Sequence, residues 1–155
     1  MTRKFLIFGI FYLAIVLNAC SDAELSREDE IKLYIESGIE AAESRSSGDL
    51  AELIDESYLD DKGLNKTQLT KLLRLYFIKH KNIYLFSKLD TIEFPSANEA
   101  IVTLRIAMAG SVISDVNALS SLRARIYQFE LSLVKDEEWL LRQARWHAAS
   151  LSDMQ

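Results

Sequence analysis

The spacing of apolar residues changes part-way along this chain, and the change restricts the folds open to it. Between residues 26 and 81, apolar residues recur every three or four positions, which is typical of one helical face. Between residues 82 and 148 they alternate with polar residues, as in strands that bury one face. Helices followed by strands predict an α+β domain, with the helices on one face of an antiparallel sheet.

Three helices are expected before the sheet. The pair Ser26 and Asp29 resembles a capping box at the start of the first helix, and Gly48 is the expected residue at its end. A short second helix is expected over Asp49–Ser57. Asn65 or Thr67 is expected to cap the third helix, which carries the clearest amphipathic stripe of the chain. The stripe consists of Leu69, Leu72, Leu73, Tyr76 and Phe77.

About four strands are expected, joined as hairpins into a curved antiparallel sheet. Their expected ranges are Asn82–Phe94, Glu99–Ala109, Arg123–Val134 and Glu138–Ala148. The last strand changes phase along its length, because Trp139 and Leu141 fit one face whereas Ala144 and Trp146 fit the other. A β-bulge between these pairs is therefore predicted.

The N-terminus has the features of a secretory signal. Arg3 and Lys4 precede 13 residues, Phe5–Leu17, that are all apolar, aromatic or glycine, which is short for a membrane span. The next residues complete Leu17-Asn18-Ala19-Cys20, which resembles the lipobox of bacterial lipoproteins. That resemblance implies a lipid thioether on Cys20 and cleavage before it. An ordinary signal peptide with a coincidental cysteine, or an uncleaved anchor helix, are the alternatives.

These features predict the organisation of the chain. Residues 1–19 form a lipoprotein signal peptide, 20–25 a lipidated tether, 26–148 one α+β domain and 149–155 a C-terminal tail. The residue after the cysteine is serine, which by resemblance to enterobacterial sorting favours the outer membrane, facing the periplasm. The membrane is therefore an expected partner through the lipid on Cys20.

Charge and cysteine content exclude several classes of function. The chain has 18 basic and 23 acidic residues, and the predicted signal peptide holds two of the basic ones, so the mature chain has a net charge of −7. This acidity disfavours nucleic acid as a partner. A single cysteine excludes a disulfide within the chain. No motif for a metal, a phosphate or a cofactor occurs, so no metal and no cofactor is expected.

The order of elements from Ser26 to Ala148 resembles the nuclear-transport-factor-2-like superfamily, which includes the SnoaL-like and cystatin-like cones. Ala41–Leu50, which joins the first two helices, and Glu138–Trp146, the closing strand, carry the resemblance. Tyr58–Leu89 also resembles uncharacterised proteobacterial lipoproteins of this fold. The resemblance implies a cone of three helices wrapped by a curved sheet. Its members include isomerases, dehydratases, cyclases, transport adaptors and assembly factors, so function stays open.

Four residues are candidates for a pocket or its mouth. Asp90 is an acid within a strand, where it could act as a base or simply pair with Lys88 in solvent. Arg125 shares a face with Tyr127, and a cation there could bind a carboxylate or phosphate or form a surface salt bridge. His147 could line the open end of a cone or lie at its edge.

The 13-residue break Gly110–Leu122 between two strands is a candidate interaction loop. Its apolar residues include Val112, Ile113 and Val116. It could close over the cone as a lid, dock on a partner or the membrane, or pack its apolar residues inside the domain.

These observations favour a lipid-anchored envelope protein whose non-catalytic domain binds a protein partner or a small apolar ligand. The alternative is a small-molecule isomerase or dehydratase that uses an Asp or His in the cone. A pocket containing a strongly perturbed carboxylate or histidine would favour the enzyme.

The Cys20→Ala variant tests the predicted anchor. It should abolish lipidation, because the thioether needs the thiol, and should leave precursor or a soluble product. Fractionation and mass spectrometry of the membrane-bound chain would measure this. Acyl-dependent membrane association that persists in the variant would contradict it.

Overall fold

The structure is a computed structural model, and it describes residues 25–121 and 124–154. The predicted signal peptide, Cys20 and the tether as far as residue 24 lie outside the described residues. In chain order the elements are α2 (Arg27–Glu43), α3 (Ser47–Glu52), α4 (Lys66–Lys79), β1 (Tyr84–Ser96), β2 (Glu99–Ala109), α5 (Ala118–Ser121), β3 (Arg125–Lys135), β4 (Trp139–Ala148) and the 3-10 helix η1 (Leu151–Met154). None of the described helices is long and apolar enough to cross a membrane.

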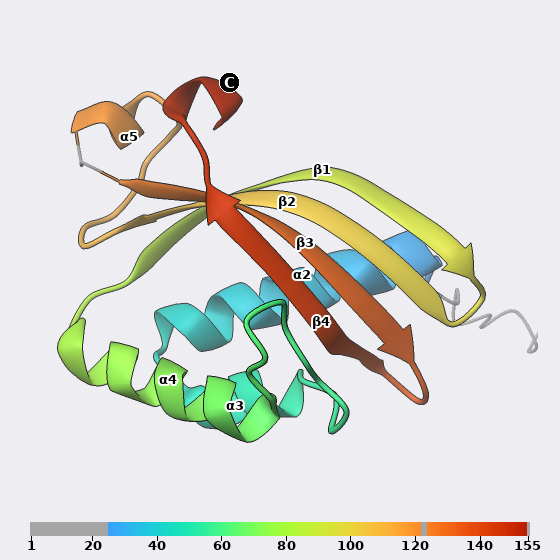
Figure 1. Cartoon of the computed structure of the whole chain (residues 1–155). Helices are drawn as coiled ribbons and strands as arrows, with labels where there is room; N and C mark the ends of the chain where they lie inside the picture. The colour runs from blue at the N-terminus through green and yellow to red at the C-terminus, as the bar shows by residue number, and fades with distance from the viewer. Residues whose placement is uncertain (1–24, 122–123, 155) are drawn as a thin grey trace, which may run out of the picture.

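Among the described residues, the strands form one antiparallel sheet in the order β1-β2-β3-β4. The sheet curves over α2, α3 and α4, which lie together beneath its concave face (Figure 1). The short helices α5 and η1 lie on the opposite side of the sheet (Figure 1). This confirms the predicted α+β cone of three helices on a curved four-stranded sheet.

The narrow end of the cone is a packed core. Ile31 of α2 is fully buried against Leu133 and Trp139. Next to Ile31, Glu30 accepts hydrogen bonds from Lys135 Nζ at 2.8 Å and from Trp139 Nε1 at 2.8 Å. The hydrogen bond from Lys135, with that from Trp139, lowers the pKa of Glu30. These contacts fix the start of α2 to the β3–β4 hairpin.

The first helix ends differently from the prediction. The backbone NH of Ser46 donates to Ala41 O at 2.9 Å, and Arg45 between them has φ of 59°. This is a Schellman end with arginine at the left-handed position that glycine usually occupies. The prediction that Gly48 ends the helix is wrong, because Gly48 lies within α3.

The second helix is shorter than predicted. Its cap is the Ser46 side chain, which accepts from Asp49 N at 3.2 Å, so α3 begins before Asp49. It does not continue to Ser57, because the following segment runs beside β4 and Asp55 N donates to Leu141 O at 2.9 Å. This pairing covers the exposed edge of β4. The cap of α4 is Asn65, in a capping box with Gln68, so the Asn65 alternative is confirmed.

The pairing register shifts at three points, once between β3 and β4 and twice along β1, where the later shift lies between Glu93 and Ser96. In β4, Ser132 pairs with Gln143 and Leu133 with Leu141, which leaves Arg142 as the extra residue and confirms the predicted bulge. In β1, pairing steps from Leu89 to Thr91, and Asp90 is the extra residue. The sequence did not predict this second bulge, and it separates Asp90 from the face that Ile92 shares with the core.

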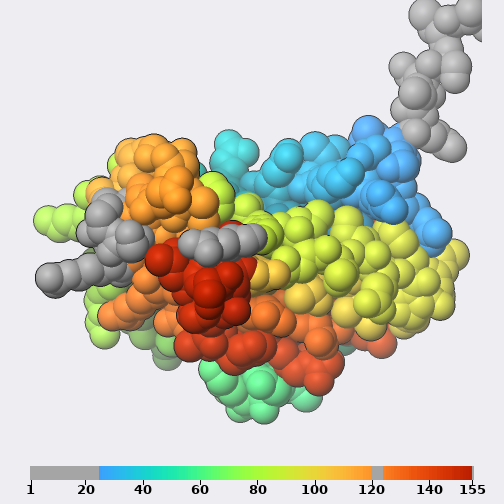
Figure 2. All heavy atoms as spheres, turned by 90° about the horizontal axis from the view of Figure 1, so that it is seen from above, coloured from blue at the N-terminus to red at the C-terminus, as the bar shows by residue number. Residues whose placement is uncertain are grey.

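The segment between β2 and β3 packs on the outer face of the sheet. Ile113 and Val116 contact a cluster formed by Ala107, Leu119, Ile126 and Met154. Ala107 lies between two cavity-facing residues of β2, so this cluster is on the convex side. Figure 2 shows α5 and η1 side by side over the sheet.

Two expectations change as a result. Ile113 and Val116 do not form a lid over the concave face, whereas Val112 is 67% exposed and its interaction role stays a prediction. The residues predicted as a tail include η1, whose Met154 is 3% exposed.

Two substitutions in the segment between β2 and β3 compare the stability contributed by a buried side chain with that of an exposed one. Leu119→Ala should lower the free energy of unfolding by about 2–5 kcal/mol, because it removes a buried side chain. Val112→Ser should change it by less than about 0.5 kcal/mol, because the side chain is exposed. Urea denaturation measures both. Equal losses would show that Val112 is also part of the core.

Candidate functional site

A cavity of about 430 Å³ lies between the helices and the concave face of the sheet. This volume is within the range of small-molecule binding sites. Its lining is predominantly apolar and comes from every strand and from α2, α3 and α4. The wall on the helical side includes Ile35, Ile39, Leu69, Leu72, Leu73, Tyr76 and Phe77, and the wall on the sheet side includes Leu104, Ile106, Phe129, Leu131, Leu141 and Trp146. The predicted α4 stripe therefore faces the cavity in full.

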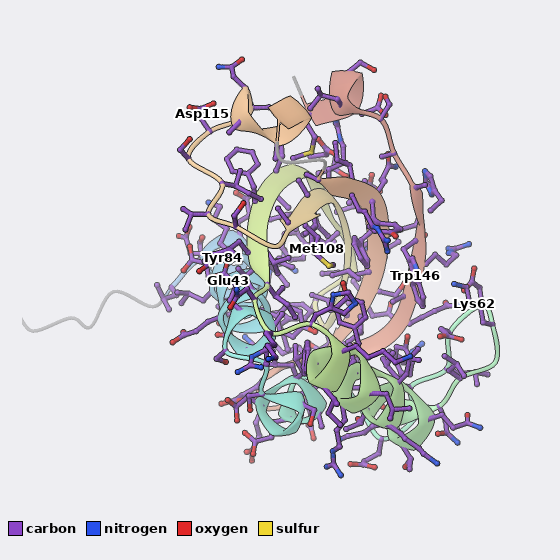
Figure 3. The ribbon with its side chains drawn as sticks, turned by 90° about the vertical axis from the view of Figure 1, so that its left-hand side faces the viewer. Glu43, Lys62, Tyr84, Met108, Asp115 and Trp146 are labelled. Carbon is purple, nitrogen blue, oxygen red and sulfur yellow. The ribbon has the colours of Figure 1, made fainter. Side chains whose placement is uncertain are left out.

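Contacts at both sides of the sheet hold the helical layer in place. On the β1 side, Glu43 of α2 accepts a hydrogen bond from Leu85 N at 2.8 Å. On the β4 side, Lys62 Nζ lies 4.0 Å from the ring centroid of Trp146. Figure 3 shows Glu43 and Lys62 on opposite sides of the curved sheet, with Met108 between them. The helical layer is therefore attached at two edges of the sheet, and the cavity lies between these two attachments.

Small side chains in the walls contribute to the hollow. Gly38 and Ala42 line it from α2, and Ala144 lines it from β4. A Cβ atom built on Gly38 would lie 3.8 Å from Leu53 Cδ1, which is an ordinary contact. Gly38 is therefore not required by a close helix approach, and its missing side chain leaves space in the cavity.

The hydroxyl group of Tyr34, in the inner wall of the cavity, has a hydrogen-bond partner. Tyr34 Oη donates to Leu53 O at 3.1 Å. Burial raises the pKa of the Tyr34 phenol well above its usual value, and the nearby Tyr58 adds to this effect. Tyr34 is therefore neutral at physiological pH and fixes the segment after α3.

The mouth of the cavity combines one cation with two phenols. Arg125, exposed at the start of β3, and Tyr127 both line the cavity, as predicted for a pocket mouth. Across from them, Tyr76 Oη donates to Met108 Sδ at 2.9 Å. Burial raises the pKa of Tyr76, and the positive charge of Arg125 opposes that rise. Among the described lining residues, Arg125 is the one charged side chain.

The structure places Asp90 outside the cavity. Its carboxylate binds the guanidinium of Arg105, with Nε and Oδ2 2.7 Å apart. Arg105 lies between the cavity-facing residues Leu104 and Ile106, so this pair is on the convex side. The hydrogen bond that Arg105 donates to Asp90 raises the pKa of Arg105. Asp90 therefore does not point into the cone as a catalytic base would.

His147 is also outside the cavity. It is exposed and follows the cavity-lining Trp146 in β4, so it projects to the opposite face. His147 therefore lies on the outer face of the sheet and does not line the cavity. Of the four predicted residues, the structure brings together Arg125 and Tyr127 alone.

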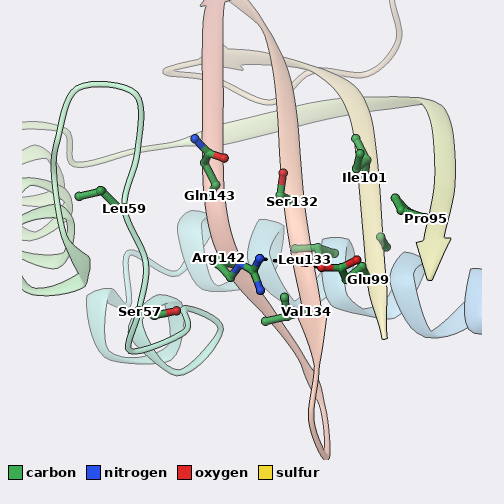
Figure 4. A pocket seen from close by; sticks show the side chains of 11 residues that line it. Ser57, Leu59, Pro95, Glu99, Ile101, Ser132, Leu133, Val134, Arg142 and Gln143 are labelled. Carbon is green, nitrogen blue, oxygen red and sulfur yellow. Dashed lines mark ion pairs between the residues drawn. The ribbon is translucent and has the colours of Figure 1, made fainter. Parts of the chain in front are cut away.

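A second hollow, of about 540 Å³, lies on the outer face of the sheet at the opposite end from α5. Figure 4 shows it in front of the strands, with the helices behind them. Its two charged residues face each other, with Arg142 Nη2 and Glu99 Oε1 3.8 Å apart. The rest of its lining mixes polar residues such as Ser132 and Gln143 with apolar ones such as Leu59 and Ile101. Within the described residues, no group of three His, Cys, Asp or Glu side chains could hold a metal ion.

Solved structures with the same arrangement identify the fold. A putative scytalone dehydratase from Novosphingobium aromaticivorans has a TM-score of 0.64 at 15% identity, over 79% of this chain and 84% of that one. A ketosteroid isomerase-like protein from Erwinia carotovora atroseptica has a TM-score of 0.60 at 12% identity, over 81% and 99%. An NTF-2 like protein of unknown function from Shewanella oneidensis has a TM-score of 0.58 at 15% identity, over 78% and 98%.

The fold is the nuclear-transport-factor-2-like cone. Identities this low establish the fold and leave the activity open. No family model and no curated protein matches the sequence.

Sequence reasoning missed several lining residues. Tyr34 and Met108 lie on the apolar faces of a helix and a strand, and the sequence gives no reason to expect a cavity beside either residue. Trp146 needed the bulge at Arg142 before its face could be assigned. The alternation of β3, which places Tyr127 and Phe129 together, was the one signal that identified the mouth in advance.

The cavity predicts unequal costs for two leucine substitutions. Leu133→Ala should cost about 2–5 kcal/mol of unfolding free energy, because Leu133 is 1% exposed in the packed core. Leu73→Ala should cost less than about 2 kcal/mol, because Leu73 is half-buried beside space that is already empty. Denaturant titration of both variants measures the difference, and equal costs would mean that the cavity is filled.

Proposed function

We propose that this domain is a binding module that holds one small apolar molecule inside the cone and carries out no reaction on it. The observation that carries the proposal is the cavity of about 430 Å³, whose described lining contains no Asp, Glu, His or Cys. A site of this kind favours burial of apolar surface, at about 25 cal/mol per Å² removed from water.

The alternative of an isomerase or dehydratase lacks support from the positions of the titratable groups. Such an enzyme needs a base or acid within hydrogen-bond reach of the substrate. Asp90 and His147, the two candidates, both lie on the outer face. The phenols of Tyr34 and Tyr76 have raised pKa values, which keeps them protonated at neutral pH, so neither can act as a base there.

We further propose that a lipid on Cys20 anchors the domain at the outer membrane, facing the periplasm. The support is the Leu17-Asn18-Ala19-Cys20 segment after an apolar run. The five residues that follow the cysteine span at most roughly 17 Å, so the cone would stay near the bilayer. An apolar ligand could then be exchanged with the membrane over a short distance. A protein partner at Val112 stays a prediction.

Filling the cavity tests the binding proposal. The mature chain with Cys20→Ser, which carries no acyl chain, would be titrated with the neutral apolar dye N-phenyl-1-naphthylamine. Ala42→Phe should weaken dye binding by about tenfold or more, because the ring occupies the space that the dye needs. The free energy of unfolding should stay equal or rise, since the ring gains contacts in an existing hollow.

Ser37→Phe is the matched control, because Ser37 is exposed on the same helix. It should leave both dye affinity and stability unchanged. Failure of the parent chain to bind the dye, or equal binding by parent and Ala42→Phe, would refute the proposal. If the dye bound elsewhere on the surface, the Ala42→Phe variant would bind it as tightly as the parent chain does.

A further inference from the structure

We infer that the ligand is a single-chain amphiphile with a carboxylate head, bound with its tail in the cone and its carboxylate at Arg125. This inference rests on the proposed binding function and assigns the chemical class of ligand. The geometry of the mouth supplies the argument, because one cation and two phenols stand where the apolar cavity meets solvent.

Arg125 differs from other arginines of the sheet in its surroundings. Arg105 pairs with Asp90, Arg142 with Glu99, and Arg145 with Glu130. Within residues 25–121 and 124–154, no salt bridge involves Arg125. Its guanidinium carries five donors in a planar fork that fits the two oxygens of a carboxylate. An anionic ligand is therefore the missing partner that this position accommodates.

The phenol of Tyr76 is a second donor at the same mouth. It donates to Met108 Sδ at 2.9 Å, and a thioether sulfur is a weak acceptor. A carboxylate oxygen would be a stronger acceptor for the same hydrogen. Met108, which accepts this hydrogen bond, is paired with Arg125 across β2 and β3, and Tyr76, Met108 and Arg125 all line the cavity. Tyr76 and Arg125 could thus donate to one carboxylate.

The charge balance favours a carboxylate over a phosphate monoester. Among the described lining residues there is one cation, which neutralises a single negative charge. A phosphate monoester carries more than one charge near neutral pH and would leave the excess uncompensated. Behind the mouth the lining is predominantly apolar and the Tyr34 hydroxyl already donates to Leu53 O, so an alkyl chain fits there at little cost in desolvation.

Dodecanoate and dodecanol provide a matched pair of probes for the mature Cys20→Ser chain. Displacement of N-phenyl-1-naphthylamine would measure the affinity of each. Dodecanoate should bind about tenfold more tightly than dodecanol, as expected for charge-assisted hydrogen bonds at a partly exposed site. Arg125→Gln should remove this preference by weakening dodecanoate binding about tenfold, and Arg125→Lys should retain part of it.

Arg74→Gln is the matched control, because it removes the same charge from an exposed position of α4 outside the cavity. It should retain the full preference for dodecanoate. Equal affinities for acid and alcohol, or a preference that survives Arg125→Gln, would overturn the inference while dye binding still supports the proposed function. Tighter, Arg125-dependent binding of dodecyl phosphate would overturn the carboxylate assignment. Absence of dye binding would refute both proposals.

Discussion

The bulges in the two outer strands are the constraint on which the rest of the structure depends. An extra residue at Asp90 in β1 and another at Arg142 in β4 bend the outer strands of the sheet. Each bulge also resets which side chains face inward, so that Leu141, Ala144 and Trp146 line the same cavity. Without this resetting, part of each outer strand would present polar residues to the helices. The curvature and the apolar interior therefore have a common cause.

A curved sheet and straight helices cannot remain in contact along their whole length. At the narrow end, Ile31 and Leu133 pack fully, and Glu30 binds the β3–β4 hairpin. At the wide end, the strands diverge from α4 and the small residues Gly38 and Ala42 do not fill the space. The domain thus has stability at one end and an apolar hollow at the other.

Ion pairs on the convex face contrast with the cation at the mouth of the cavity. Carboxylates on that face bind arginines of the sheet, as Asp90 binds Arg105 and Glu130 binds Arg145. The Glu130–Arg145 pair is exposed and contributes little stability, whereas the Asp90–Arg105 pair is partly buried; in both pairs the two charges are satisfied. The apolar residues Ile113 and Met154 cover the rest of that face near α5. At the mouth of the cone, by contrast, Arg125 lies beside apolar residues of the cavity lining.

Local sequence patterns determined the order of the elements, the α4 stripe, the faces of β2 and β3, and the bulge in β4, because each depends on residues close together in the chain. They also placed Arg125 beside Tyr127. The tertiary structure alone decided that Asp90 forms a bulge and that Ile113 packs outside the cone. These depend on long-range pairing and on how far a bent sheet stands from its helices. Sequence periodicity marks a face as apolar, but it does not distinguish a filled core from a hollow one.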